Sequence, residues 1–156
     1  MNRRTMRVVL LTVAIVGTVL LAGAGAAQAD EVDPRISAAL AAEPGGVVVD
    51  GDTVVWPELG MELQLGSALT RSVGTCATGS HCAFSGIGLT GSKLSWTTCT
   101  SSHSVAALGG IVRSIADARS SGSSSARSSS GGLLATAPAG GWANVSGTVS
   151  YVSCTT

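Results

Sequence analysis

The 156-residue sequence has few of the residues that build large cores or strongly charged surfaces. Aromatic residues make up 3% of it and charged residues 12%. No cluster of four or more basic residues occurs, so the sequence lacks the electrostatic footprint of a nucleic-acid-binding protein. Because large side chains are scarce, we expect disulfide bonds to contribute strongly to stability, at about 2–5 kcal/mol each.

The sequence also lacks the patterns of most catalytic and metal-binding sites. Its two histidines, His81 and His103, are isolated, and we expect them at the surface or in turns. Neither paired C-x-x-C spacing nor a G-x-S-x-G turn occurs, so we expect no metal site, no catalytic residues and no enzymatic activity. Residues 86–91 match G-x-G-x-x-G letter for letter, but no helix follows and no acid lies about 20 residues on. We interpret these glycines as turn residues and expect no cofactor.

What the sequence does have is an export signal at its N-terminus. Its positive n-region contains three arginines: Arg3, Arg4 and Arg7. An apolar run follows over residues 8–21, and Ala27-Gln28-Ala29 fits the small-x-small pattern of a cleavage site. An uncleaved membrane anchor is the alternative, but the second half of the stretch is rich in Gly and Ala instead of Leu. We therefore predict a signal peptide over residues 1–29, which leaves a secreted chain with no membrane segment and keeps the Sec and twin-arginine routes both open.

The mature chain from Asp30 onward has an acidic first part. The whole mature chain carries nine acids and six bases, a net charge of −3, and residues 30–71 hold eight of those acids. We predict that residues 30–71 form an N-terminal extension made of a helix and a β-hairpin. Asp33 is suited to cap the helix and Pro34 to begin it, and Asp50-Gly51 is typical of a hairpin turn.

Residues 72–156 are rich in Gly, Ser and Thr and show no helical periodicity. Short β-type stretches recur about every ten residues between turn residues, which favours a Greek-key sandwich or barrel. The expected strands are residues 81–85, 92–98, 113–116, 124–128, 133–137, 143–146 and 149–153. Residues 120–132 have the composition of a flexible linker. Because strand patterning and a cysteine follow them, we interpret them as a weak edge strand with mobile ends.

All the cysteines lie in this second part: Cys76, Cys82, Cys99 and Cys154. An even number in an exported chain predicts two disulfides, with three pairings open. Residues 76–82 read C-x-x-G-x-x-C, and an alternating strand and a Gly-rich turn follow through Lys93. This segment resembles the opening of the secreted βγ-crystallin-like metalloprotease inhibitors of actinobacteria. Residues 112–117 are similar to a later Ser-containing segment of that family, so the resemblance covers about half of the mature chain.

The resemblance implies a mainly β fold, with a βγ-crystallin-like Greek-key domain over residues 72–156. It favours one disulfide pairing, in which Cys76–Cys82 closes a small loop and Cys99–Cys154 ties the middle of the domain to its last strand. Calcium-binding members of the family carry paired Asp or Asn residues two positions before a Ser-Ser, whereas this chain has Gly109-Gly110 at that place. We therefore expect no calcium site.

The resemblance further implies a peptidase inhibitor that binds an extracellular protease, above all a metalloprotease, through a protruding loop. Family inhibitors pin this loop with a nearby cysteine pair, but the corresponding residues 131–135 include no cysteine. Leu133 and Leu134 are the candidate inhibitory residues, with positions in a core strand as the alternative. The alternative function is a non-inhibitory structural or cell-envelope-associated protein. A well-ordered protruding loop near Leu133 favours inhibition, and a buried strand there favours the alternative.

Overall fold

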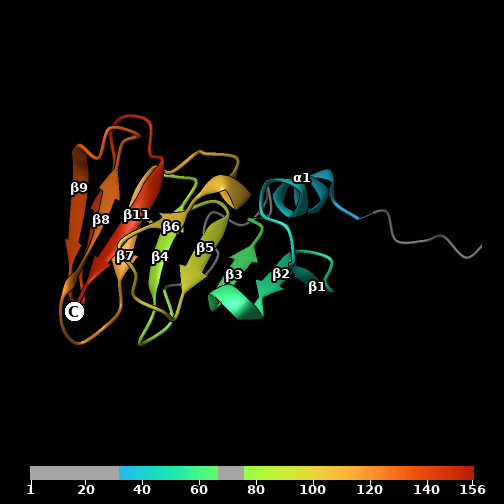
Figure 1. The fold of residues 1–156 in the computed structure, drawn as a ribbon, viewed down its shortest axis with the longest axis horizontal. Helices are drawn as coiled ribbons and strands as arrows, with labels where there is room; N and C mark the ends of the chain where they lie inside the picture. Colours follow the sequence, from blue (N-terminus) through green and yellow to red (C-terminus); the bar gives the residue numbers. More distant parts are fainter. Residues whose placement is uncertain (1–31, 67–75) are drawn as a thin grey trace, which may run out of the picture.

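The computed structural model describes residues 32–66 and 76–156, which form a mainly β, sandwich-like fold with one short N-terminal helix (Figure 1). The signal peptide predicted for residues 1–29 and the boundary predicted between residues 71 and 72 lie outside the described residues. The elements in chain order are α1 (Pro34–Ala42), β1 (Val47–Asp50), β2 (Thr53–Trp56), the 3-10 helix η1 (Pro57–Leu59), β3 (Met61–Gln64), β4 (His81–Phe84), β5 (Lys93–Trp96), β6 (His103–Ser104), the 3-10 helix η2 (Ala106–Leu108), β7 (Ser114–Asp117), β8 (Ser123–Arg127), β9 (Leu133–Pro138), β10 (Trp142–Asn144) and β11 (Tyr151–Thr155).

The strands form two antiparallel sheets. The larger sheet has seven strands in the order β1-β2-β3-β5-β4-β7-β10, and the smaller has four in the order β6-β11-β8-β9. β7 contacts β8 and β9 across the interface between the sheets. The described part of the chain contains no helix long and apolar enough to cross a membrane.

Strands β4 to β7 and strands β8 to β11 form two four-strand units with the same connections. In the first unit β4 pairs with β5 and β7, while β6 crosses to the other sheet and pairs with β11. In the second unit β8 pairs with β9 and β11, while β10 crosses and pairs with β7. Each unit therefore places its third strand in the sheet of the other, which ties the two sheets together.

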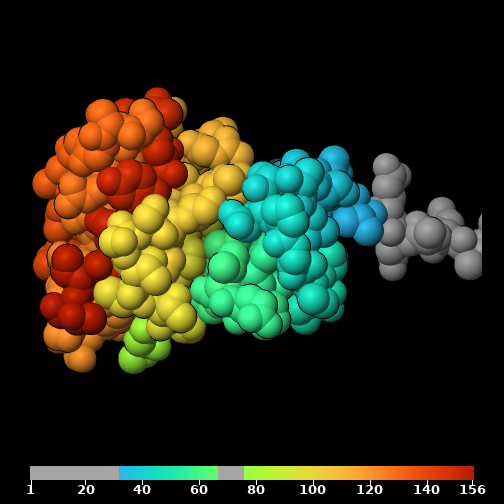
Figure 2. All heavy atoms as spheres, in the orientation of Figure 1, coloured from blue at the N-terminus to red at the C-terminus, as the bar shows by residue number. Residues whose placement is uncertain are grey.

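The acidic N-terminal residues contain the predicted helix and hairpin. The Asp33 side chain accepts a hydrogen bond from the Arg35 backbone N–H at 2.8 Å, and Pro34 occupies the first turn of α1. β1 and β2 pair around the predicted turn, and β3 then pairs with β5, with Met61 opposite Trp96. These strands belong to the same sheet as β5, β4, β7 and β10, and Figure 2 shows the residues of the N-terminal strands in direct contact with the later part of the chain.

The main apolar core runs through both regions. It joins buried side chains of α1, β2 and β3 to those of the two four-strand units, including Ile36, Val54, Leu63, Leu94, Ile115 and Val152. Disulfide bonds link Cys76 to Cys82 and Cys99 to Cys154, the pairs that the sequence analysis favours. The long bridge fixes the segment after β5 to the last strand.

Strand β8 corrects one prediction. Residues 120–132 were expected to hold a weak edge strand, but β8 pairs with β9 on one side and β11 on the other, so it is an interior strand. Ser124 is fully buried there and donates a hydrogen bond to Asp117, and Ser125 shares a hydrogen bond with Thr136. A serine-rich segment is suited to an interior position when its hydroxyl groups have partners.

Candidate functional site

Several connections lie at the end of the sandwich opposite the C-terminus (Figure 1), and we call them together the loop end. They are residues 85–92, 109–113, 128–132 and 145–150. In the larger sheet, Phe84 and Asn144 lie opposite Ser114 at this end. In the smaller sheet, Leu133 and Tyr151 lie opposite Arg127.

Residues 145–150 join the loop end into one unit. The Val145 N–H donates to the Arg113 carbonyl oxygen at 2.8 Å, and the Ser150 N–H donates to the Arg127 carbonyl oxygen at 2.8 Å. The four connections contain no Asp or Glu and one basic residue, Arg113. Large aliphatic side chains lie exposed within or beside them: Ile87, Ile111 and Leu133. The loop end is therefore a weakly charged surface with exposed apolar side chains.

The β8–β9 turn, where the sequence analysis places the inhibitory residues, is held by Arg127. The Arg127 guanidinium donates to the Gly131 carbonyl oxygen and to the Ser153 hydroxyl, each at 3.0 Å. Leu133 is the first residue of β9 and is 60% exposed, whereas Leu134 is partly buried against the core. The turn itself is thus residues 128–132, and the two leucines lie at its edge in the strand.

The β4–β5 connection is fixed more extensively. The buried Ser114 hydroxyl donates to the Gly86 carbonyl oxygen at 2.7 Å and accepts from the Leu89 N–H at 3.0 Å. The Asn144 side chain accepts from the Gly88 N–H at 2.8 Å. Leu89 has a φ of 64°, and no other non-glycine residue in the described ranges has a positive φ. Ile87 lies in the middle of this connection and is 67% exposed.

The opposite end of the sandwich buries both histidines, against the expectation of surface or turn positions. His81 stacks on Trp96 with ring centroids 5.3 Å apart and lies 4.7 Å from the His103 ring. Neither His81 ring nitrogen has a hydrogen-bond partner among the described residues. Burial, together with the nearby His103 and Arg119, lowers the pKa of His81 to about 4, so the ring is neutral at pH 7. Burial also lowers the pKa of His103, whose Nε2 accepts from the Thr100 N–H at 3.1 Å.

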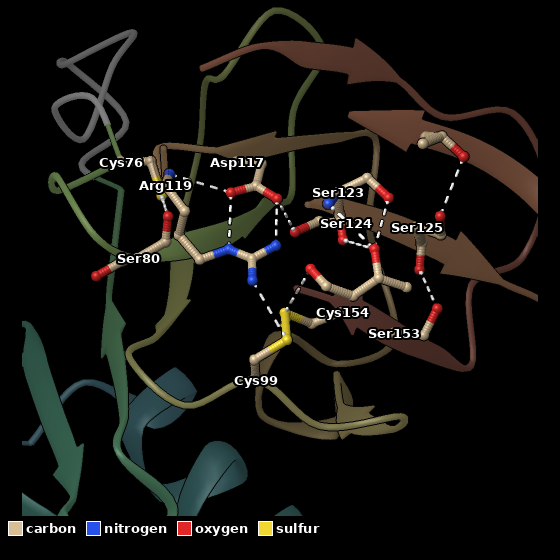
Figure 3. A network of polar contacts seen from close by, with 12 residues as sticks. Cys76, Ser80, Cys99, Asp117, Arg119, Ser123, Ser124, Ser125, Ser153 and Cys154 are labelled. Carbon is tan, nitrogen blue, oxygen red and sulfur yellow. Dashed lines mark hydrogen bonds and ion pairs between the residues drawn. A yellow bond between two sulfur atoms is a disulfide. The ribbon is translucent and has the colours of Figure 1, made fainter. Parts of the chain in front are cut away.

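Beside these rings, Asp117 and Arg119 form a buried ion pair (Figure 3). The Arg119 Nε and Nη2 groups donate to the two carboxylate oxygens at 2.9 and 2.5 Å, and Ser124 donates to Oδ2 at 3.0 Å. Arg119 also reaches the Sγ atom of Cys99 in the long disulfide at 3.3 Å. Burial raises the pKa of Asp117, but the hydrogen bonds from Arg119 and Ser124 outweigh it, so the pKa lies below its usual value.

The buried polar end has the features of a structural network. The Asp117 carboxylate is occupied by Arg119 and Ser124, and the ring nitrogens of His81 bond to neither Asp117 nor a serine. In the part of the chain that the structure describes, no nucleophile–base–acid relay is therefore formed around His81. Across residues 32–66 and 76–156, no three His, Cys, Asp or Glu side chains gather closely enough to hold a metal ion.

One cavity, of about 390 Å³, lies between α1 and η2 and is lined mainly by alanines and leucines; Ser85, Ser92, Gly109 and Ile111 of the loop end also line it. The other, of about 370 Å³, has His103 and Trp96 in its wall and Glu43 and Glu58 also lining it.

No protein-family model, curated protein or solved structure matches the chain.

Proposed function

We propose that the protein is a secreted inhibitor of extracellular proteases, with metalloproteases as its main targets, and that the loop end is the inhibitory surface. It acts by occupying the substrate cleft and carries out no chemistry itself. The observation that carries the proposal is the set of exposed aliphatic side chains beside turns fixed by internal hydrogen bonds. A turn that is already ordered loses little conformational entropy on binding, which favours tight association.

The arrangement of the strands supports the fold that the proposal requires. In a Greek key the fourth strand returns to lie beside the first. β7 lies beside β4, and β11 lies beside β8, in this way. We take the two units as a βγ-crystallin-like Greek-key pair. The two disulfides further support a secreted protein, because such bonds persist in oxidising compartments.

Arg127 supplies a substitute for the missing cysteine pair. Its guanidinium on β8 donates to the Gly131 carbonyl group within the β8–β9 turn and to the Ser153 hydroxyl on β11. Such charge-assisted hydrogen bonds are stronger than those between neutral groups, so the bond to Gly131 restricts the turn. The absence of cysteine in residues 131–135 therefore does not leave the turn unsupported.

A second candidate function rests on Leu134. This side chain packs on the core, and both leucines belong to strand β9 and not to a protruding loop. That placement favours the non-inhibitory structural or cell-envelope-associated protein. In that case the exposed aliphatic side chains of the loop end have no protease partner.

The test is a titration of a thermolysin-type metalloprotease with the purified, oxidised chain from Asp30 onward, with a serine protease run beside it. The proposal expects inhibition to reach completion at one chain per enzyme. Reduced and alkylated chain is the matched control and should lose the inhibition, because unfolding removes the fixed turns. If neither protease is inhibited at micromolar concentrations of folded chain, the second candidate function replaces the first.

A further inference from the structure

We infer that the β4–β5 connection, residues 85–92, is the segment that enters the protease cleft, with Ile87 as its anchoring side chain. This inference rests on the proposed function and goes beyond it, because the sequence points to Leu133 and Leu134. The β8–β9 turn then makes a flanking contact.

The position of Ile87 suits insertion into a cleft better than that of Leu133. The Ser85 N–H bonds to the Ser92 carbonyl oxygen at 2.9 Å and closes the connection at its base, so Ile87 lies beyond the ends of β4 and β5. It is 67% exposed. Leu133 lies opposite Arg127 in the strand ladder, and its backbone is therefore part of the sheet. An apolar subsite can surround a side chain that lies at a turn more completely than it can surround a side chain that lies on a strand.

The backbone around Ile87 is held in one conformation from two other strands. Ser114 of β7 binds the Gly86 carbonyl oxygen and the Leu89 N–H, and Asn144 of β10 binds the Gly88 N–H. The left-handed conformation of Leu89 is unfavourable for a leucine and persists only where surrounding contacts impose it. Such strain is concentrated at binding and active sites in proteins. The turn is therefore organised before it meets a partner.

The two four-strand units explain why a second loop is available. Residues 85–92 connect the first and second strands of the first unit, and residues 128–132 connect the equivalent strands of the second unit. Residues 145–150 lie between them, because Asn144 holds Gly88 and Ser150 bonds to Arg127. The two connections are therefore joined through residues 144–150.

The chemistry of the turn identifies the subsite it fits. Residues 85–92 contain only Ser, Gly, Ile, Leu and Thr, so no charge has to be desolvated. Ile87 is flanked by Gly86 and Gly88, which allow the backbone of the partner to approach closely. The partner is thus a protease whose cleft has an uncharged, aliphatic subsite, and we expect binding that changes little with salt concentration.

The experiment measures the inhibition constants of four oxidised chains against the thermolysin-type metalloprotease. The chains are the wild type, Ile87→Asp, Ile87→Val and Leu133→Asp. A charge buried at the anchoring position should raise the constant about 30-fold or more. Ile87→Val removes one methylene group and should raise it about fourfold. Leu133 is the matched exposed aliphatic residue, and Leu133→Asp should raise the inhibition constant less than Ile87→Asp does. Thermal unfolding of each variant checks that the fold is kept.

A second variant tests the fixed geometry without changing the contact side chain. Asn144→Ala removes the hydrogen bond to Gly88 and should weaken inhibition several-fold while the exchange rate of the Gly88 amide rises. Equal inhibition by the wild type and Ile87→Asp overturns the inference but leaves the proposed function standing. Loss of inhibition only in Leu133→Asp also overturns the inference and leaves the proposed function standing, with the β8–β9 turn as the main contact. Failure of the wild type itself overturns both.

Discussion

The buried Asp117–Arg119 pair gives the sharpest stability prediction, because the chain contains an exposed copy of it. In both Asp33-x-Arg35 and Asp117-x-Arg119, the arginine Nε and Nη2 groups bond to the carboxylate two residues before it. The arginine side chain is 53% exposed in the first pair and 13% exposed in the second. The two pairs therefore share their arginine–carboxylate hydrogen bonds and differ in burial.

Arg119→Ala leaves the Asp117 carboxylate buried, with only a backbone N–H and Ser124 as donors. Removing one partner of a buried ion pair costs about 3–5 kcal/mol, and we expect about 3 kcal/mol here because protonation of the carboxyl limits the penalty. For a domain of this size that corresponds to a fall in melting temperature of roughly 10 °C. Arg35→Ala is the matched control and should destabilise the fold far less, because water replaces the lost contacts.

The pH dependence of this effect has a defined sign. In the wild type the folded pKa of Asp117 is lowered, so its contribution is complete above the unfolded pKa of about 4 and is lost as the pH falls through the folded pKa. In Arg119→Ala, burial without the guanidinium raises that pKa, and protonation relieves the penalty. The difference in unfolding free energy between variant and wild type should therefore shrink from pH 7 to pH 4 in urea titrations. A difference that equals that of Arg35→Ala, or that grows on acidification, refutes the reasoning.

Two further predictions concern the disulfides and the buried histidine. Removal of the Cys99–Cys154 bridge, whose cysteines are 55 residues apart, should lower the free energy of unfolding by about 4 kcal/mol. Removal of the Cys76–Cys82 bridge, whose cysteines are 6 residues apart, should lower it by about 2 kcal/mol. Denaturation of the paired Cys→Ser variants measures both losses, and equal losses would contradict loop closure as their cause. Because the folded pKa of His81 is lowered to about 4, wild-type stability should fall as the pH drops from about 6.5 to about 4, by on the order of 3 kcal/mol. His81→Leu should remove most of this dependence, and an unchanged pH profile would show that the ring is not held neutral.

Local signals in the sequence predict much of the fold correctly. Asp33-Pro34 begins α1, and β1 and β2 meet at Gly51-Asp52, directly after Asp50, because capping and turn formation depend on neighbouring residues alone. Each of the later strands expected from short β-type stretches overlaps an observed strand. The order of the strands does not follow from such signals. β3 pairs with β5 although residues 65–92 separate the two strands in the sequence, and no local pattern predicts a pairing over that separation.

The missed features have identifiable causes. β6 has two residues, of which His103 is buried, and it lies in a Ser/Thr run with no alternation to reveal it. His81 is buried because β4 is covered on both faces, which only the assembled sandwich determines. The Asp117–Arg119 pair had a usable signal, since Asp117 is the only acid after residue 71 and repeats the Asp-x-Arg spacing of Asp33.

For the candidate site, the resemblance indicates residues 131–135, and the structure has a hydrogen-bonded turn just before Leu133. The glycines of residues 86–91 were correctly interpreted as turn residues. Gly86 and Gly88 bond to Ser114 and Asn144, which lie 28 and 56 residues away in the sequence. The rigidity of the Ile87 turn was therefore not visible in its own residues.

Hydrogen–deuterium exchange of the oxidised chain, alone and with a catalytically inactive thermolysin-type protease, tests the central claim most directly. It locates the contact surface without altering any residue of the chain. The account predicts slower exchange in residues 85–92 and 128–134 on addition of the protease, and no change in α1 and β1. Protection confined to α1 and β1, or no protection anywhere at saturating protease, would contradict the assignment of the loop end as the inhibitory surface.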